Sequence, residues 1–283
     1  MATRLLGWLF GTNSNERGHE RERVKKFRKY GWRPDLPDHR DKKFLSVYPK
    51  DTNNELPETL DLRDKMPAVY DQGRLGSCTA NAAAAIFQYD QVKQGLNFFV
   101  PSRLFIYYCE RDLEGTVDFD SGATMRDSMV VLNQFGVPNE NDWPYDISQF
   151  AVKPPEGIYL ESLINHAVSY YSIDTTIDDF KHALNSGFPV IFGFSVPSSF
   201  ENFETAQTGI MKMPEANEVI VGGHAVVACG YDDHASHYGN SGYLLVRNSW
   251  GTDWGQGGYF WMPYDFVKPM YCGSCWVLET IVE

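Results

Sequence analysis

The order of its apolar patterns is the feature that most restricts how this chain can fold. Before about residue 166, apolar residues recur at helical spacing in three stretches that are each followed by a glycine, at 78–94, 101–113 and 124–135. After it, apart from a short helical pattern at 177–185, the chain has short runs rich in β-branched and aromatic residues, at 190–196, 224–230, 242–247, 258–262 and 275–282. Helices followed by strands predict an α+β protein with two subdomains.

Composition excludes several classes of protein. Of the 283 residues, 43% are hydrophobic and 14% aromatic, which is enough for a substantial core and excludes a disordered chain. No run approaches the roughly 18 consecutive apolar residues of a membrane-spanning helix. The apolar run 5–10 is short for a signal peptide, and no small-residue cleavage site follows it. We therefore expect no membrane span and a cytoplasmic or unconventionally exported protein.

Charge divides the chain into a basic arm, residues 1–54, and an acidic body, residues 55–283. The arm has thirteen Lys and Arg against seven Asp and Glu, a net charge of +6; the body has twelve against thirty, a net charge of −18. An acidic body is unsuited to nucleic acid, so we expect no such partner. The opposite charges would instead allow the arm to dock on its own body.

Five cysteines are spread along the chain and do not form the framework of a disulfide-rich protein. Cys272 and Cys275 form a lone C-x-x-C pair without a histidine at ligand spacing, so we expect two ordinary thiols and no metal site. The sequence predicts a polar loop at 232–241, and we expect His234 and His237 in it to be solvated. We expect His166 and His182 on helix surfaces or at helix ends.

Three separated segments carry residues suited to nucleophilic catalysis: 72–78, 222–226 and 248–251. Cys78 opens a predicted helix, where the helix dipole and a nearby imidazolium favour the thiolate and lower its pKa. His224 follows 146 residues later, and Asn248 a further 24. Each residue alone has an ordinary structural explanation, but their order and spacing together predict one site.

This combination resembles the papain/cathepsin-type cysteine peptidases, for which the Cys…His…Asn order is a known signature. The resemblance covers about 55–283 and includes Asp61-Leu62-Arg63, Tyr107-Tyr108-Cys109, Ser121-Gly122, Trp143-Pro144-Tyr145 and Asn248-Ser249-Trp250-Gly251-Thr252-Asp253-Trp254-Gly255. It implies a papain-like two-subdomain fold. The helical left subdomain would span 55–165, the β-barrel-like right subdomain 166–283, and the cleft would lie between them.

The resemblance also implies a role for each site residue. Cys78 would be the nucleophile, His224 its acid/base partner and Asn248 the residue that orients the imidazole. Gln72 would contribute to the oxyanion hole, and Trp250 would shield the hydrogen bond of the histidine. The cleft walls would include Gly122, Ala123, Gly222, Gly223 and Ala225.

The implied reaction is hydrolysis of peptide bonds through an acyl-thioester, without metal or cofactor. No His-His pair lies between Cys78 and Ser121, as it would in carboxydipeptidase relatives, so we expect an endopeptidase that acts as a monomer on protein or peptide substrates. The alternatives are a catalytically silent member of the fold, or an exopeptidase or transpeptidase.

A second cysteine imitates the motif around a papain-type nucleophile. Cys272-Gly273-Ser274-Cys275-Trp276 has the local pattern, whereas Cys78 has Leu75 and Thr79 at the equivalent flanks. However, Pro269 stands six residues before Cys275 and offers no side-chain donor, and neither His nor Asn follows it. We therefore assign the nucleophile to Cys78.

The arm contains a proline-punctuated run, Gly31 to Asp41, that resembles the short leader of microbial members such as xylellain. Arg23 and Phe27 are only fragments of the longer cathepsin L-type prosegment. We expect the run to lie extended across the cleft over Cys78 as an intramolecular inhibitor, with docking that weakens with salt and acid. The residues expected to block the cleft are Trp32, Arg33, Pro34, Asp35, Leu36 and Pro37.

Overall fold

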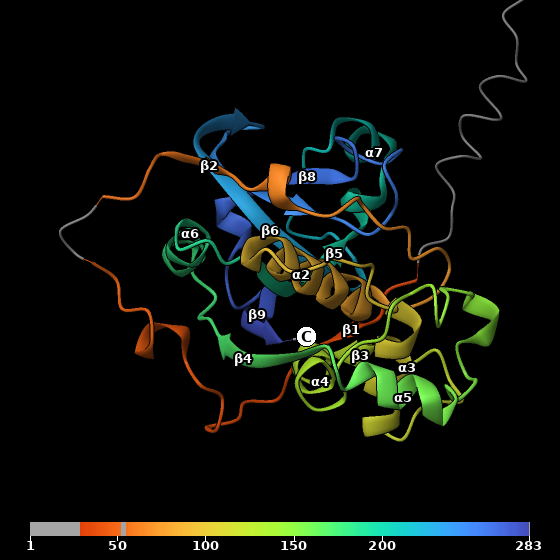
Figure 1. Ribbon diagram of the computed structural model, residues 1–283. Coiled ribbons are helices and arrows are strands. Elements are labelled where there is room, and N and C mark those ends of the chain that lie inside the picture. Colours follow the sequence, from red (N-terminus) through yellow and green to blue (C-terminus); the bar gives the residue numbers. More distant parts are fainter. Residues whose placement is uncertain (1–28, 52–54, 283) are drawn as a thin grey trace, which may run out of the picture.

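The computed structural model describes residues 29–51 and 55–282; the apolar run 5–10, Arg23 and Phe27 lie outside them. A curled antiparallel sheet has the strand order β4-β9-β5-β6-β7-β8, and β2 also pairs with β6 (Figure 1). Its strands are β2 (Thr59–Asp61), β4 (His166–Ser172), β5 (Val190–Pro197), β6 (Ile220–His237), β7 (Asn240–Arg247), β8 (Tyr259–Pro263) and β9 (Cys272–Val282).

Helices lie on both sides of this sheet. They are α2 (Cys78–Gln94), α3 (Arg103–Leu113), α4 (Met125–Val130) with a π-helical continuation (Val131–Phe135), α5 (Glu156–Ser162), α6 (Ile177–Asn185) and α7 (Phe203–Thr208). Short 3-10 turns occur at Phe44–Ser46, Arg63–Lys65, Ile147–Gln149, Ser198–Glu201 and Tyr264–Phe266. Within the described ranges, none of the helices has the length and apolar character needed to cross a bilayer.

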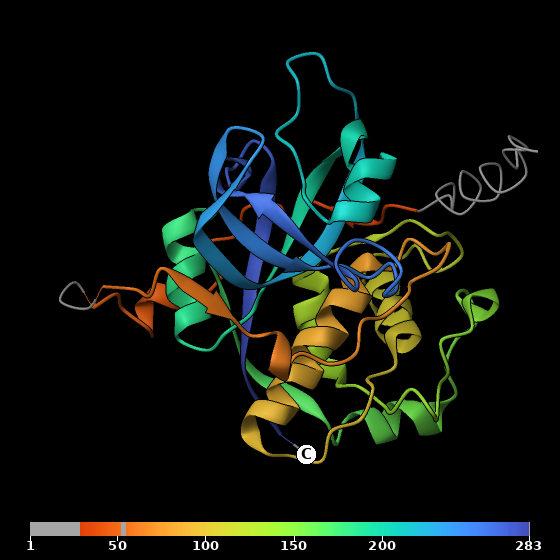
Figure 2. The same ribbon diagram turned by 90° about the horizontal axis from the view of Figure 1, so that it is seen from above.

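Helix α2 is the central element of the molecule. It contacts α3 and α4 on one side and β5, β6 and β9 on the other (Figures 1 and 2). All of its residues from Cys78 to Gln91 are buried, and four consecutive alanines at 82–85 allow its neighbours to approach closely. The helix ends at Gly95, whose φ of +69° suits the left-handed cap of a helix.

The sheet separates two apolar cores. Neighbouring residues of β5 point to opposite faces, so Ile191 contributes to one core and Phe192 to the other. One core lies between the sheet and the helices around α2; the second lies inside the curl of the sheet and includes residues of α6. The fold is therefore α+β, as the order of the sequence patterns predicts.

Several sequence-based expectations about local structure are wrong. His166 begins strand β4 rather than lying on a helix, and β6 and β7 extend to 237 and 240, so His234 and His237 belong to strands. The short helices α5 and α7 were not predicted. In these segments, pairing with distant strands and packing against neighbours outweigh the weak local pattern.

The described part of the arm is integrated into this fold. Strand β1 (Trp32–Arg33) pairs in parallel with β3 (Ala123–Thr124) and also contacts β5 and β6, so the arm passes between the helices and the sheet (Figure 1). Further on, the backbone amide of Ser172 in β4 donates to the carbonyl oxygen of Lys42 at 2.8 Å. Phe44 is 1% exposed and belongs to the core inside the curl.

Candidate active site

Cys78 is the first residue of α2 and is completely buried. Burial raises the pKa of its thiol to about 11, while hydrogen bonds from the backbone of Ala225, Gly31 and Thr79 act in the opposite direction. The helix N-terminus alone predicts a lowered pKa. Here desolvation outweighs the helix dipole, because the arm residue Gly31 closes over the sulfur.

His224 and Asn248 face α2 from the sheet, at β6 and immediately after β7. The imidazole Nε2 lies 2.8 Å from the Asn248 Oδ1, which also accepts a hydrogen bond from the Ser249 amide. Because an amide oxygen can only accept, Nε2 carries the proton and Nδ1 is the basic nitrogen. Trp250 stacks on the imidazole at 4.8 Å between ring centroids, with 25° between the planes.

Gln72 is held rigidly beside this group. Its side-chain nitrogen donates to the carbonyl oxygens of Leu75 at 2.9 Å and of Lys29 at 3.1 Å. Its Oε1 accepts a hydrogen bond of 2.6 Å from the Ser249 hydroxyl. Ser249 thus connects the amide of Gln72 to the segment that carries Asn248. The role of Ser249 was not predicted, although its place within the Asn-Ser-Trp-Gly run was an available signal.

A buried carboxyl group that was not predicted lies behind the cysteine. Glu110 of α3 is completely buried and accepts hydrogen bonds from the hydroxyls of Thr79 at 2.8 Å and Ser128 at 2.5 Å. Burial raises its pKa to about 8. Through this contact, Thr79 attaches the start of α2 to α3 and α4.

The arm occupies the space between the two walls. The Tyr30 ring lies 6.0 Å from the His224 ring and 6.2 Å from that of Trp250, between centroids. The carbonyl oxygen of Gly31 accepts a hydrogen bond of 2.8 Å from the Ala123 amide. The cleft of this chain is therefore filled by its own residues.

Three of the predicted wall glycines leave room for this arm. A Cβ atom would lie 1.9 Å from the Gly31 carbonyl oxygen if placed on Gly122, 2.6 Å from the Tyr30 ring on Gly222, and 2.5 Å from the Trp32 carbonyl oxygen on Gly223. These three glycines therefore line the path of the arm.

The prediction for the arm itself is wrong in register. The residues nearest the thiol, His224 and Gln72 are Lys29, Tyr30 and Gly31, not the proline-rich part of the run. Of the six residues expected to block the cleft, Trp32, Arg33 and Asp35 contact the body. The remaining three, Pro34, Leu36 and Pro37, are exposed. Glycine and two flanking aromatic residues fit the narrow space better than proline rings do.

Asp35 anchors the arm beyond the cleft. Its carboxylate accepts hydrogen bonds from the Trp276 indole at 2.8 Å and the Arg126 amide at 3.1 Å. Burial raises the pKa of this carboxyl group. The docked arm thus holds a proton on Asp35 more tightly than an exposed arm would, so this group favours docking as the pH falls toward ~4. The expected weakening by acid rests on the carboxylates of the body and stays a prediction; Asp35, which belongs to the arm, acts in the opposite direction.

The residues set aside in the sequence analysis have ordinary surroundings. Cys275 is buried, with the Thr175 hydroxyl 3.5 Å from its sulfur, and its pKa is raised to about 12 by burial. Among the described residues, no group of His, Cys, Asp or Glu side chains is arranged to hold a metal ion.

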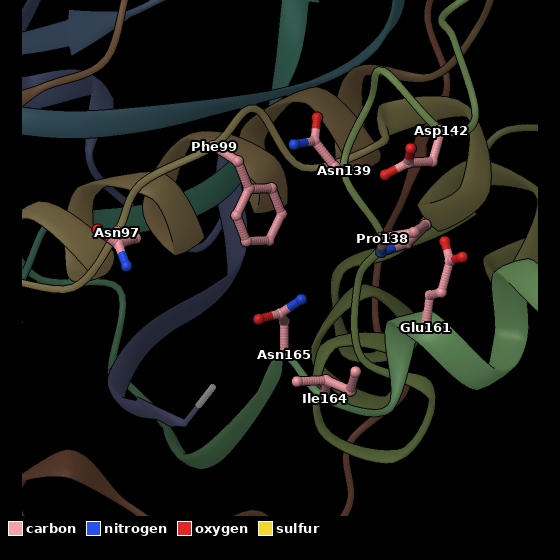
Figure 3. A pocket seen from close by; sticks show the side chains of 8 residues that line it. All are labelled: Asn97, Phe99, Pro138, Asn139, Asp142, Glu161, Ile164 and Asn165. Atoms are coloured by element: carbon pink, nitrogen blue, oxygen red, sulfur yellow. The ribbon is translucent and has the colours of Figure 1, made fainter.

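A hollow on the helical side is separate from this group. Figure 3 shows amide and carboxylate side chains and one aromatic ring around it, but none of the residues near Cys78. Its lining consists of Asn97, Phe99, Pro138, Asn139, Asp142, Glu161, Ile164 and Asn165.

Known proteins are similar to this chain in sequence and in structure. Xylellain, a cysteine protease from Xylella fastidiosa, is 38% identical with a TM-score of 0.79, and the match covers 89% of this chain and 97% of xylellain. A peptidase C1-like protein of Acanthamoeba polyphaga mimivirus is 45% identical over 75% of this chain and 70% of its own length. A cathepsin L-like proteinase of Fasciola hepatica is 27% identical over 76% of this chain and 63% of its own.

The sequence profile that describes the papain family cysteine proteases matches residues 56–270. With the xylellain structure and the papain-like α+β architecture, this match shows that the chain belongs to the papain family of cysteine proteases.

Proposed function

We propose that the protein is a cysteine endopeptidase whose N-terminal arm blocks its own cleft. In the reaction, the sulfur of Cys78 attacks the peptide carbonyl carbon and forms a C–S bond, while the C–N bond breaks. His224 takes the thiol proton and gives it to the departing amine, and water then hydrolyses the acyl-thioester. Asn248 holds the imidazole in the tautomer that leaves Nδ1 available for this transfer.

The observation that carries this proposal is the hydrogen bond from Gln72 to the Lys29 carbonyl oxygen. In the reaction, the Gln72 side chain and the Cys78 backbone amide would stabilise the negative oxygen of the tetrahedral intermediate. An arm carbonyl already occupies this donor, and Gly31 lies over the sulfur. A substrate cannot reach either group until the arm leaves.

The direction of the arm supports its resistance to cleavage. The departing amine must lie beside His224, which protonates it, so the acyl part of a substrate lies on the opposite side of the sulfur. The arm has its earlier residue, Tyr30, at His224 and its later residue, Trp32, on the acyl side. It therefore runs opposite to a substrate and presents no peptide bond in the reactive orientation.

The histidine and asparagine differ in their expected contributions. Asn248→Ala should lower kcat/KM less than His224→Ala, because Asn248 only orients the ring whereas His224 moves the proton. We expect a loss of about tenfold to 100-fold for the first and about four orders of magnitude for the second. Steady-state kinetics with the arm released would measure both, and equal losses would mean that Asn248 does more than orient.

Cleavage products distinguish an endopeptidase from the alternatives. A peptide blocked at both ends should be cut internally, with no transfer to an added amine, and an epoxide inhibitor should label Cys78 stoichiometrically once the arm is released. Absence of labelling in folded protein would favour a catalytically silent member. Cleavage that requires a free terminus would favour an exopeptidase.

A further inference from the structure

Trp32 lies in a side-chain pocket of its own beside the thiol. It is 8% exposed, although Arg33 and Pro34, which follow it, are exposed. A Cβ atom on Gly193 would lie 1.9 Å from its Cε2 and 2.2 Å from its Cδ2. The bicyclic ring therefore rests directly on the backbone of β5.

The pocket floor is formed by glycines on neighbouring strands. The two floor glycines are Gly193 and Gly223: Gly193 pairs with Ala225 of β6, and Gly223 pairs with Ser195 two residues further along β5. A Cβ atom on Gly223 would lie 2.8 Å from the Cε3 of Trp32. Neither Gly193 nor Gly223 has a positive φ, so the backbone would accept other residues here. The glycines provide space for a flat ring rather than an unusual backbone conformation.

The position of this pocket identifies the substrate residue that would fill it. Gly31 lies over the sulfur, so a substrate places there the residue that forms the acyl-thioester. Trp32 is the next residue on the acyl side, away from His224. The second residue before the scissile bond would therefore direct its side chain toward Gly193.

We infer that Gly193 and Gly223 make this chain selective for substrates with a large, flat, bicyclic aromatic side chain at the second residue before the scissile bond. The inference rests on the proposed function and specifies its substrates. An added Cβ on Gly193 would overlap the ring edge, whereas a small aliphatic side chain would leave the floor uncovered.

In the part of the chain that the structure describes, the pocket provides no hydrogen-bond acceptor for the indole. The indole nitrogen of Trp32 is buried without a hydrogen-bond partner among the described residues. A buried donor that loses its water without a replacement weakens binding. A naphthyl group has a similar size and no N–H, so it should suit the pocket better than the indole does.

The test uses fluorogenic peptides that differ only at this position, with valine, leucine, phenylalanine, tryptophan or 2-naphthylalanine. The enzyme is the full chain carrying Gly31→Ala, whose new Cβ would lie 1.7 Å from the Gly76 carbonyl oxygen and so displace the arm. We expect kcat/KM to be at least tenfold higher for the bicyclic residues than for valine, with naphthylalanine severalfold above tryptophan. Adding Gly193→Val should lower the ratio of naphthylalanine to valine about 100-fold.

Matched variants keep the result interpretable. Gly193→Ala places the same Cβ with less bulk, so it should shift the ratio in the same direction if the valine variant unfolds. Gly273→Ala is the control on the adjacent strand, because its Cβ would meet no atom within 4 Å, and it should leave the ranking intact. Hydrolysis of no peptide at all would refute the proposed function. Hydrolysis without preference for bicyclic rings, or a ratio insensitive to Gly193, would overturn the pocket alone.

Discussion

Replacing Cys78 by alanine should abolish peptide hydrolysis, whereas Cys275→Ala should leave kcat within a few-fold of the parent. Only Cys78 lies at the start of α2 between Gln72 and the strand that carries His224. Cys275 lies in β9 beside Thr175, and burial raises the pKa of its thiol to about 12. Removing a nucleophile typically costs four or more orders of magnitude in kcat.

The comparison is made in full chains with the arm released by Gly31→Ala, by steady-state hydrolysis and by labelling with the epoxide. Thermal unfolding confirms that each variant is folded. A folded Cys275→Ala protein without activity would contradict the assignment of the nucleophile. So would retained hydrolysis after Cys78→Ala.

The parts of the fold that the sequence predicts well are those with a strong local signal. The helix over 78–94 has the predicted bounds, because its buried alanine-rich stretch ends at a glycine that can adopt a positive φ. The candidate site was predictable for a different reason. The chemistry requires a thiol, an imidazole and an amide at a characteristic spacing, and Gln72 six residues before the thiol narrows the choice further.

The features that the sequence does not reveal depend on distant contacts. Strand β4 exists because it pairs with β9, more than a hundred residues later. In the sequence, Glu110 is indistinguishable from an ordinary helix residue. Its role appears only in the fold, where α2 and α4 place Thr79 and Ser128 beside it. The register of the arm depends on close backbone packing. A Cβ atom on Gly31 would meet the Gly76 carbonyl oxygen, and one on Gly122 would meet the Gly31 carbonyl oxygen. A single sequence does not show this packing.

The arm also contributes to the apolar core of the body. Deleting residues 1–54 would remove Phe44, which is 1% exposed and stacks 4.8 Å from Tyr48, with Phe188 at 5.5 Å. Loss of a buried phenylalanine costs about 3–5 kcal/mol, so the shortened body would be destabilised as well as uncovered. A single substitution within the cleft can displace the arm there without removing Phe44, so it separates release of the cleft from loss of stability.

Gly31→Ala should therefore raise the activity of the full chain by at least 100-fold at low salt. The new Cβ would overlap the backbone of Gly76, which cannot move aside as a flexible side chain could, so the arm must leave the cleft. Leu36→Ala is the matched control, since Leu36 belongs to the same arm and is 80% exposed, and it should have no effect. Activities of the two variants and the parent that agree within a few-fold would refute the blocking role of the arm.

Salt should release the arm far less than Gly31→Ala does. Beside the cleft, the ion pairs Lys29–Asp120 and Arg33–Glu114 join the arm to the acidic body, but the two basic side chains are 57% and 47% exposed. Exposed pairs of this kind contribute about 0–1 kcal/mol each, so screening both should change kcat/KM by tenfold or so at most. Trp32 and the backbone hydrogen bonds at Lys29 and Gly31 remain in place at any ionic strength. If salt alone activated the parent as fully as Gly31→Ala does, charge rather than the fit of Gly31 and Trp32 would hold the arm in the cleft.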